Sequence, residues 1–230
     1  MGKNLRQQRR GKGSQRYRSP SHRFLGEVKY DDIEKKEGVV IDIVDAPGRT
    51  IPLAIVDYPN GKELMIPPEG LSVGERVGYN IEMKNGAILK LADIPEGTKI
   101  YNIEIRPKDG GKLCRASGTF ATLVTKGKDK AVIQLPTGIL KTVSVECRAT
   151  IGVVAGSGRP EKPFLKAGNR YYTMKAMGRY YPIVKGVSKN PVDHPFGGKT
   201  KPGKHKTVSR HMPPGKKVGS ISPRRTGKKK

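Results

Sequence analysis

Short apolar runs separated by turn sequences dominate the middle of the chain. A first group of four β-branched runs ends where Asn85-Gly86 offers a turn or a junction; its members are residues 39–44, 51–56, 62–66 and 76–83. Runs of this length, bounded by Pro and Gly, are typical of strands joined by tight turns. Several short strands in so few residues favour a small closed barrel of the OB type, although the spacing leaves an SH3-like barrel open.

A second group of strand-like runs follows, at residues 100–105, 112–125, 131–135 and 139–154. Within the last run, Val143, Val145 and Cys147 alternate with polar residues, which places one apolar face inward and one polar face outward. The pattern predicts a second all-β barrel. Its expected outward positions include basic residues that favour RNA contact over an ordinary solvated face, namely Lys112, Arg115, Lys141 and Arg148.

One short helix is predicted over Asn169–Met177, after a loop-like stretch that begins at Gly156-Ser157-Gly158. This stretch lacks the third glycine and the Lys-Ser/Thr ending of a phosphate loop, which argues against a nucleotide site there. Packing is favoured over base stacking for the tyrosines in and after the helix, Tyr171, Tyr172, Tyr180 and Tyr181.

Both ends of the chain are rich in Gly, Lys and Arg and poor in apolar residues. Residues 1–25 bury too little apolar surface to offset the entropy of ordering, about 1–2 kcal/mol per residue, so this arm is expected to be disordered when free. Tyr17, His22 and Phe24 lie between arginines, which favours RNA contact over a solubilising tail or a targeting peptide. Residues 185–230 are expected to form no core of their own and to thread between RNA helices.

These patterns predict an all-β fold class: an OB-fold barrel followed by an SH3-like barrel, with long basic unstructured extensions at both ends. The expected divisions are an arm at residues 1–25, an OB-like barrel at 26–84, an SH3-like barrel at 85–184 and a tail at 185–230. Formal charge differs sharply among these segments, at +8, −5, +10 and +13 in that order. The second barrel, rather than the acidic first one, is therefore expected to carry the basic surface.

The total charge of +26 predicts a polyanionic partner, because a folded chain tolerates such self-repulsion best when an anion neutralises it. Nucleic acid is favoured over an anionic membrane, since no amphipathic helix, lipid signal or run of about 18–20 apolar residues is visible. No signal peptide is recognised either, so the protein is expected to remain in the cytoplasm. Cys114 and Cys147 are too far apart in sequence for a chelating pair and are interpreted as small buried apolar residues.

A stiff turn is predicted at Asn190-Pro191-Val192-Asp193-His194-Pro195-Phe196-Gly197-Gly198. Its prolines restrict the backbone, and its paired glycines let the backbone approach a partner closely. Asp193 beside His194 suggests an acid–base pair, but neighbouring side chains rarely face each other and no nucleophile lies at motif spacing. Metal binding is disfavoured for His194, His205 and His211, which lie in a polybasic stretch without cysteine. The expected role of His194 is to form hydrogen bonds to RNA or to clamp its own turn.

The same turn resembles a signature of the large-subunit ribosomal protein two family, and further blocks resemble that family in the same order along most of the chain. These blocks include residues 91–98, 102–104, 110–112, 115–119, 147–152 and 166–169, and residues 213–219 and 224–227 resemble the archaeal and eukaryotic branch. Many relatives carry His at the position of Phe196 and a third glycine at that of Lys199. These departures weaken any mechanism that needs a pair of histidines.

The resemblance implies an OB-fold domain, an SH3-like barrel and extensions threaded into large-subunit ribosomal RNA near the peptidyl transferase centre. It implies roles in subunit association and tRNA binding, with ribosomal RNA rather than His194 performing the chemistry. The implied partners are that RNA and neighbouring ribosomal proteins, with small-subunit ribosomal RNA and tRNA possible at the interface. No cofactor, metal or membrane is expected.

The leading hypothesis is thus a structural ribosomal protein without enzymatic activity. A general architectural protein for RNA or DNA is the alternative, and an RNA-processing or acyl-transfer enzyme using Asp193 and His194 is a third hypothesis. The residues expected to contact RNA are Arg9, Arg10, Arg16, Arg18, Arg23, Lys112, Arg115, Arg148, Arg170, Arg179, Lys185, Asn190, Asp193, His194, Gly197, Gly198, Lys199, Arg210, Lys216, Lys217, Arg224 and Arg225.

Overall fold

The computed structural model describes residues 2–31, 36–199 and 203–225, and the chain forms two compact units. One unit, Ser21–Leu165, contains the strand-rich middle of the chain; we call it the barrel unit. The other combines Met1–Pro20 with Lys166–Lys230, and we call it the terminal unit. The predicted domain boundaries after residues 25, 84 and 184 remain predictions.

The barrel unit is built on one ten-stranded sheet with the strand order β3-β2-β1-β4-β5-β10-β6-β7-β8-β9. Its strands are β1 (Lys36–Val44), β2 (Leu53–Tyr58), β3 (Gly61–Met65), β4 (Arg76–Tyr79), β5 (Ala87–Lys90), β6 (Lys99–Tyr101), β7 (Ala121–Lys126), β8 (Lys130–Gln134), β9 (Leu140–Ser144) and β10 (Arg148–Ile151). Within the described part of this sheet the one parallel pair is β4 with β5, which joins the first group of strands to the second. The predicted all-β class, an OB-like barrel followed by an SH3-like barrel, is confirmed.

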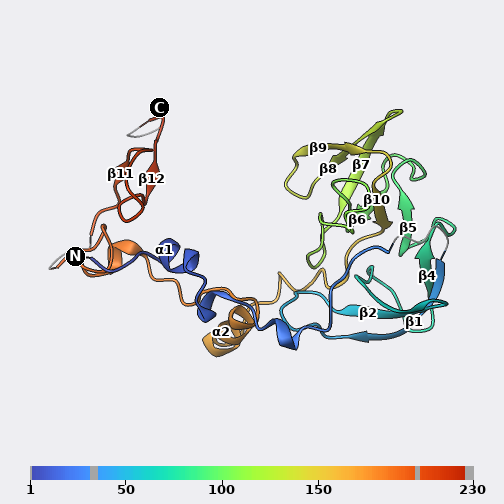
Figure 1. Ribbon diagram of the computed structural model, residues 1–230, viewed down its shortest axis with the longest axis horizontal. Coiled ribbons are helices and arrows are strands. Elements are labelled where there is room, and N and C mark those ends of the chain that lie inside the picture. The colour runs from blue at the N-terminus through green and yellow to red at the C-terminus, as the bar shows by residue number, and fades with distance from the viewer. Residues whose placement is uncertain (1, 32–35, 200–202, 226–230) are drawn as a thin grey trace. The chain divides into compact units, whose positions relative to one another are not determined.

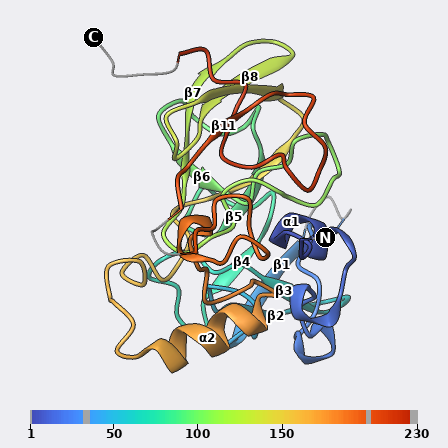
Figure 2. The ribbon, with the colours of Figure 1, turned by 90° about the vertical axis from the view of Figure 1, so that its left-hand side faces the viewer.

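Each group of strands encloses its own apolar core. Val40, Val56 and Val77 pack together in the first group, and Ile100, Leu123 and Ile133 are among the fully buried residues of the second. The pairs β1–β2 and β7–β8 lie in separate parts of the barrel unit in both views (Figure 1, Figure 2). A third cluster of buried residues contains Tyr101, whose hydroxyl donates a hydrogen bond of 2.9 Å to the Ile66 carbonyl.

The alternation predicted around Val143, Val145 and Cys147 is confirmed, since all three side chains are buried. The run from residue 139 to 154 is nevertheless not one strand, because the chain turns between β9 and β10. Cys147 is buried as expected, whereas Cys114 is only half-buried and adopts a left-handed backbone with φ of 53°. The predicted strand runs at residues 112–125 and 139–154 are therefore each interrupted, although their β-branched composition predicts continuous strands.

The described residues of the terminal unit form two α-helices and a short parallel β pair, besides short 3-10 turns. They are α1 (Arg6–Gly11), α2 (Ala167–Ala176), β11 (Thr207–Val208) and β12 (Ser220–Ile221). The predicted helix at residues 169–177 is confirmed, two residues longer at its start. No helix in the described residues is long and apolar enough to span a membrane.

A small apolar cluster holds the two ends of the chain together within the terminal unit. Leu5 packs with Phe196 and Val218, each at most 6% exposed, and Val187 covers them in part. The expectation that the tail forms no core of its own overlooked this cluster, because its members lie up to about two hundred residues apart in sequence. Phe196 and Val218 of the tail form a small core only because Leu5 of the arm packs against them.

Candidate nucleic-acid interface

The turn at residues 190–198 is closed by its own backbone. The amide of Asp193 donates to the Asn190 carbonyl at 2.9 Å, and the amide of Gly197 donates to the His194 carbonyl at 2.9 Å. A Cβ on Gly197 would lie 2.4 Å from the carbonyl carbon and oxygen of Asn190, closer than side-chain carbons approach backbone. Glycine is therefore required at this position by the turn itself, before any partner binds.

His194 clamps this turn, which confirms one of the two roles predicted for it. The amide of Phe196 donates to Nδ1 of His194 at 3.0 Å, so a neutral ring carries its proton on Nε2. The ring packs so closely over Gly186 that a Cβ there would lie 2.4 Å from Cε1. Burial, followed by the positive charge of Lys189, lowers the pKa of His194 below its ordinary value. Both effects favour the neutral form of the ring.

Asp193 is directed at the arm instead of at its neighbour His194. Its carboxylate forms an ion pair of 2.9 Å with Nζ of Lys3, and the Lys3 amide donates to the Val192 carbonyl at 2.8 Å. The hydrogen bond from Lys3 is the main reason that the pKa of Asp193 is lowered. Because each residue of the Asp193–His194 pair is engaged elsewhere, the geometry does not assemble the acid–base pair that the third hypothesis requires.

Cationic and aromatic side chains of the arm and tail line a cleft of about 580 Å³ in the terminal unit. Arg6 and Arg9 contribute from α1, and Lys185 and Lys189 contribute from the tail. Tyr17, Tyr180, Asn190 and His194 also line it. The cleft thus brings together five predicted RNA contacts, Arg9, Lys185, Asn190, Asp193 and His194. Arg6 and Lys189 also line it, although the sequence did not predict them as RNA contacts.

Most of the predicted basic contacts are exposed, as RNA binding requires. In the terminal unit these are Arg9, Arg10, Arg16, Arg18, Arg170, Arg179, Lys185, Lys199, Arg210, Lys216, Lys217, Arg224 and Arg225, and in the barrel unit they are Arg23 and Lys112. Gly197 and Gly198 are half-buried, in agreement with their part in the turn. Contact with RNA stays a prediction for every one of these positions.

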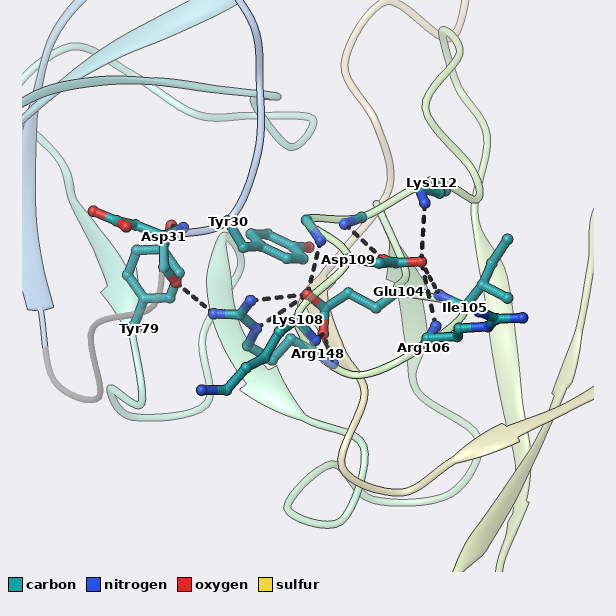
Figure 3. A network of polar contacts seen from close by, with 12 residues as sticks. Tyr30, Asp31, Tyr79, Glu104, Ile105, Arg106, Lys108, Asp109, Lys112 and Arg148 are labelled. Carbon is teal, nitrogen blue, oxygen red and sulfur yellow. Dashed lines mark hydrogen bonds and ion pairs between the residues drawn. The ribbon is translucent and has the colours of Figure 1, made fainter.

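Arg148 does not occupy the outward position that alternation predicts, and that prediction is wrong. Its side chain is only 14% exposed, and Nη2 forms an ion pair of 2.9 Å with the carboxylate of Glu104, which is fully buried. Nη1 also donates to the backbone carbonyl of Asp31, so the guanidinium lies between Glu104 and Asp31 (Figure 3). The ion pair offsets the cost of burying the guanidinium and raises the pKa of Arg148.

Glu104 and Asp109 together fix the loop that connects β6 to β7 (Figure 3). Glu104 accepts hydrogen bonds from the amides of Gly110 and Lys108 and from the Arg148 amide, at 3.0, 3.3 and 2.8 Å. Burial alone would raise the pKa of Asp109, but the amides of Arg106, Ile105 and Gly111, and then Lys112, lower it. Buried carboxylates with this many donors organise a loop instead of meeting a ligand.

The Arg115 side chain also forms hydrogen bonds within the barrel unit. Its guanidinium donates to the carbonyls of Gly111 at 2.7 Å and Val28 at 2.8 Å, and its burial, with repulsion from Arg49, lowers its pKa. Arg115 and Arg148 therefore both hold the segment that precedes β1, through Val28 and Asp31. The outward position predicted for Arg115 is also wrong, because the residue is half-buried and its guanidinium binds backbone carbonyls.

Sequence reasoning missed Glu104, the residue that decides what Arg148 does. Its signal was present as an acidic residue in a strand-like apolar run, where an unpaired charge would be costly. No cluster of potential metal ligands is found among the described residues.

Two β-barrels, with a buried ion pair between Glu104 and Arg148, and a terminal unit with exposed cations define a class: basic β-barrel proteins with cationic extensions, suited to polyanions. Residues 84–217 match the family described as Ribosomal Proteins L2, C-terminal domain. The chain is 55% identical to the large ribosomal subunit protein uL2 of Methanothermobacter thermautotrophicus, with 100% of both chains covered. It is 48% identical to uL2 of Natronomonas pharaonis, with 99% of this chain and 97% of the relative covered. The chain belongs to the large ribosomal subunit protein uL2 family, as its motif blocks predicted.

Proposed function

We propose that this protein is a structural constituent of the large ribosomal subunit and binds its ribosomal RNA mainly through the terminal unit. The observation that carries the proposal is the distribution of charge. The terminal unit contains 25 basic residues and one acidic residue, whereas the barrel unit contains 21 basic and 19 acidic residues. The exposed cations of the terminal unit can neutralise RNA phosphates, and its small core sets where they lie.

The proposed site of action is the neighbourhood of the peptidyl transferase centre in cytoplasmic ribosomes. There the protein supports subunit association, tRNA binding and peptide bond formation without catalysing the reaction. Neighbouring ribosomal proteins, small-subunit ribosomal RNA and tRNA are its further proposed partners. The engagement of His194 by Phe196 and of Asp193 by Lys3 supports a positioning role for the turn over a catalytic one.

Reconstitution with large-subunit particles lacking this protein tests the proposal. The full chain should cosediment with these particles at moderate salt, and neutralising about 6–10 phosphates should give a slope of log affinity against log salt near −5 to −9. A chain that stays unbound, or binds with a flat salt response, overturns the proposal. Equal competition by unrelated DNA would support a general architectural protein instead.

A charge-matched pair of variants shows which unit provides the affinity. Replacement of Lys216 and Lys217 by Gln removes two exposed cations of the terminal unit. Replacement of Lys62 and Arg76 by Gln removes two exposed cations from the first group of strands. The first variant should reduce incorporation and the second should leave it unchanged; the reverse order would place the RNA interface on the barrel unit.

A further inference from the structure

The cleft of about 580 Å³ in the terminal unit has features that general attraction to phosphate does not need. Its volume is in the range of sites that enclose a small ligand, which is about 300–1,000 Å³. Exposed cations on an open surface are enough to bind an RNA backbone without any cleft. A concave site with aromatic walls therefore indicates a ligand that has a flat, apolar part as well as a charge.

The aromatic part of the cleft is a preassembled stack. The rings of Tyr17 and Tyr180 are nearly parallel, with centroids 5.8 Å apart and an interplanar angle of 19°. The Arg16 guanidinium lies 4.4 Å from the centroid of the Tyr180 ring. Both rings are half-buried and both line the cleft, so their stacking surface is fixed before a ligand arrives. Such a surface suits a nucleobase, because every base has a π face.

The charged part of the cleft suits a phosphate. Arg6, Arg9, Lys185 and Lys189 all line it, whereas Asp193, the acidic residue there, is already paired with Lys3. Asn190 adds an amide group that can donate or accept a hydrogen bond at a base edge. Cations, an aromatic stack and one amide in a single cleft match the parts of a nucleotide.

We propose that this cleft binds one unpaired nucleotide of RNA, with its base against Tyr17 and Tyr180 and its phosphate among Arg6, Arg9, Lys185 and Lys189. This inference rests on the proposed function and adds a recognition element to it. A base inside a duplex is stacked on its neighbours and cannot enter such a cleft. A bulge, a loop or a strand end presents an unstacked base, so the terminal unit selects these features of RNA over regular helix.

Binding of the full chain to two RNA hairpins tests the inference directly. The hairpins have the same stem, and one of them carries a single bulged 4-thiouridine. At about 200 mM monovalent salt, where phosphate contacts are weakened, the bulged hairpin should bind about tenfold more tightly. Photocrosslinking should join the thiouridine to peptides that contain Tyr17 or Tyr180.

Three tyrosine variants give the matched comparison. Tyr180→Leu should abolish the preference for the bulge, and Tyr180→Phe should keep it, because phenylalanine retains the ring. Tyr172→Leu is the control, since Tyr172 is 69% exposed on α2 and does not line the cleft. Its replacement should leave the preference unchanged.

Equal affinity for the two hairpins, or crosslinks confined to other peptides, overturns the inference. The same two results leave the proposed function standing, because a chain that binds both hairpins with a steep salt dependence still binds RNA. If neither hairpin binds and the chain also fails to join large-subunit particles, the proposed function itself is wrong. If the Leu variant of Tyr180 misfolds, the wild-type crosslinking result still decides the question.

Discussion

The two units of this protein use the same residue, arginine, in opposite ways. In the barrel unit, Arg148 is paired with buried Glu104, and Arg115 donates to two backbone carbonyls. In the terminal unit, Arg210, Arg224 and Arg225 are exposed. The barrel unit has nearly balanced charge and extensive apolar cores, whereas the terminal unit has a small core and almost no acidic residues.

The comparison teaches that local charge density does not identify the residues that meet a polyanion. A large core can bury an arginine because it provides the carboxylate and carbonyl partners that burial requires. A chain segment without such a core leaves its cations in solvent, where they can exchange water and counterions for phosphate. Some basic residues of the second barrel therefore stabilise the fold instead of facing a partner. A nearby acidic residue in an apolar run indicates which cation is used in this way.

The largest expected effect comes from breaking the buried ion pair. Glu104→Gln should lower the free energy of unfolding by about 3–5 kcal/mol, because the largely buried guanidinium of Arg148 keeps its charge without its anion. Denaturant unfolding of the full chain measures the change. Glu146→Gln removes the partner of Lys90 in an exposed pair and should cost less than about 1 kcal/mol. Equal costs for the two variants would contradict the distinction between the buried and the exposed ion pair of the barrel unit.

The next effect is local to the terminal unit. Phe196→Ala removes the centre of the cluster with Leu5 and Val218 and should cost about 3 kcal/mol there. Hydrogen exchange should then accelerate at residues 186–198 while β7 and β8 keep their protection. Phe164→Ala changes a 45% exposed ring in the barrel unit and should alter neither region. Loss of protection in β7 and β8 would show that the two units unfold together.

A smaller effect concerns affinity. Lys216→Gln combined with Lys217→Gln should make the salt dependence of RNA binding shallower by about 2 in slope, at about 0.9 per phosphate contact. Arg115→Gln should leave the slope unchanged and reduce stability instead, because its guanidinium is engaged by Gly111 and Val28. Filter binding over a range of salt concentrations measures both. A change of slope in the Arg115 variant would restore it as a phosphate contact.

The smallest effect is a pH dependence of the turn. The folded state lowers the pKa of His194. The contribution of the neutral ring to stability is therefore complete above about pH 6.5, and it is lost as the pH falls through the lowered pKa. The Phe196 amide, which donates to Nδ1, should lose protection from hydrogen exchange in that window. The Gly198 amide donates to the Lys189 carbonyl, which does not titrate, and serves as the internal control. Parallel loss at both amides would show that the clamp is not responsible.

Several local features could be predicted because neighbouring residues decide them. The alternation at Val143, Val145 and Cys147 identified their buried face, and the motif at residues 190–198 identified a turn that glycine must complete. The prediction failed at Arg148 because alternation describes which face of a strand a residue occupies and not what packs over that face. Here Glu104 and the segment through Asp31 cover it.

The candidate nucleic-acid interface could likewise be predicted from the sequence only in part. Predicted contacts such as Arg9, Lys185 and His194 line one cleft, but sequence spacing could not show that the arm and the tail meet there. Phe196 illustrates the point. Its role as the centre of an apolar cluster depends on Leu5 and Val218.

The sequence by itself determined the all-β class, the excess of positive charge, the family and the glycine turn, because composition, short-range periodicity and local backbone restriction decide these. Tertiary structure alone decided which cations are engaged internally and which are exposed. It also decided that Tyr17 stacks on Tyr180 and that Lys3 pairs with Asp193. The physical reason is that a buried charge or a stacked ring depends on partners that the fold brings from distant parts of the chain.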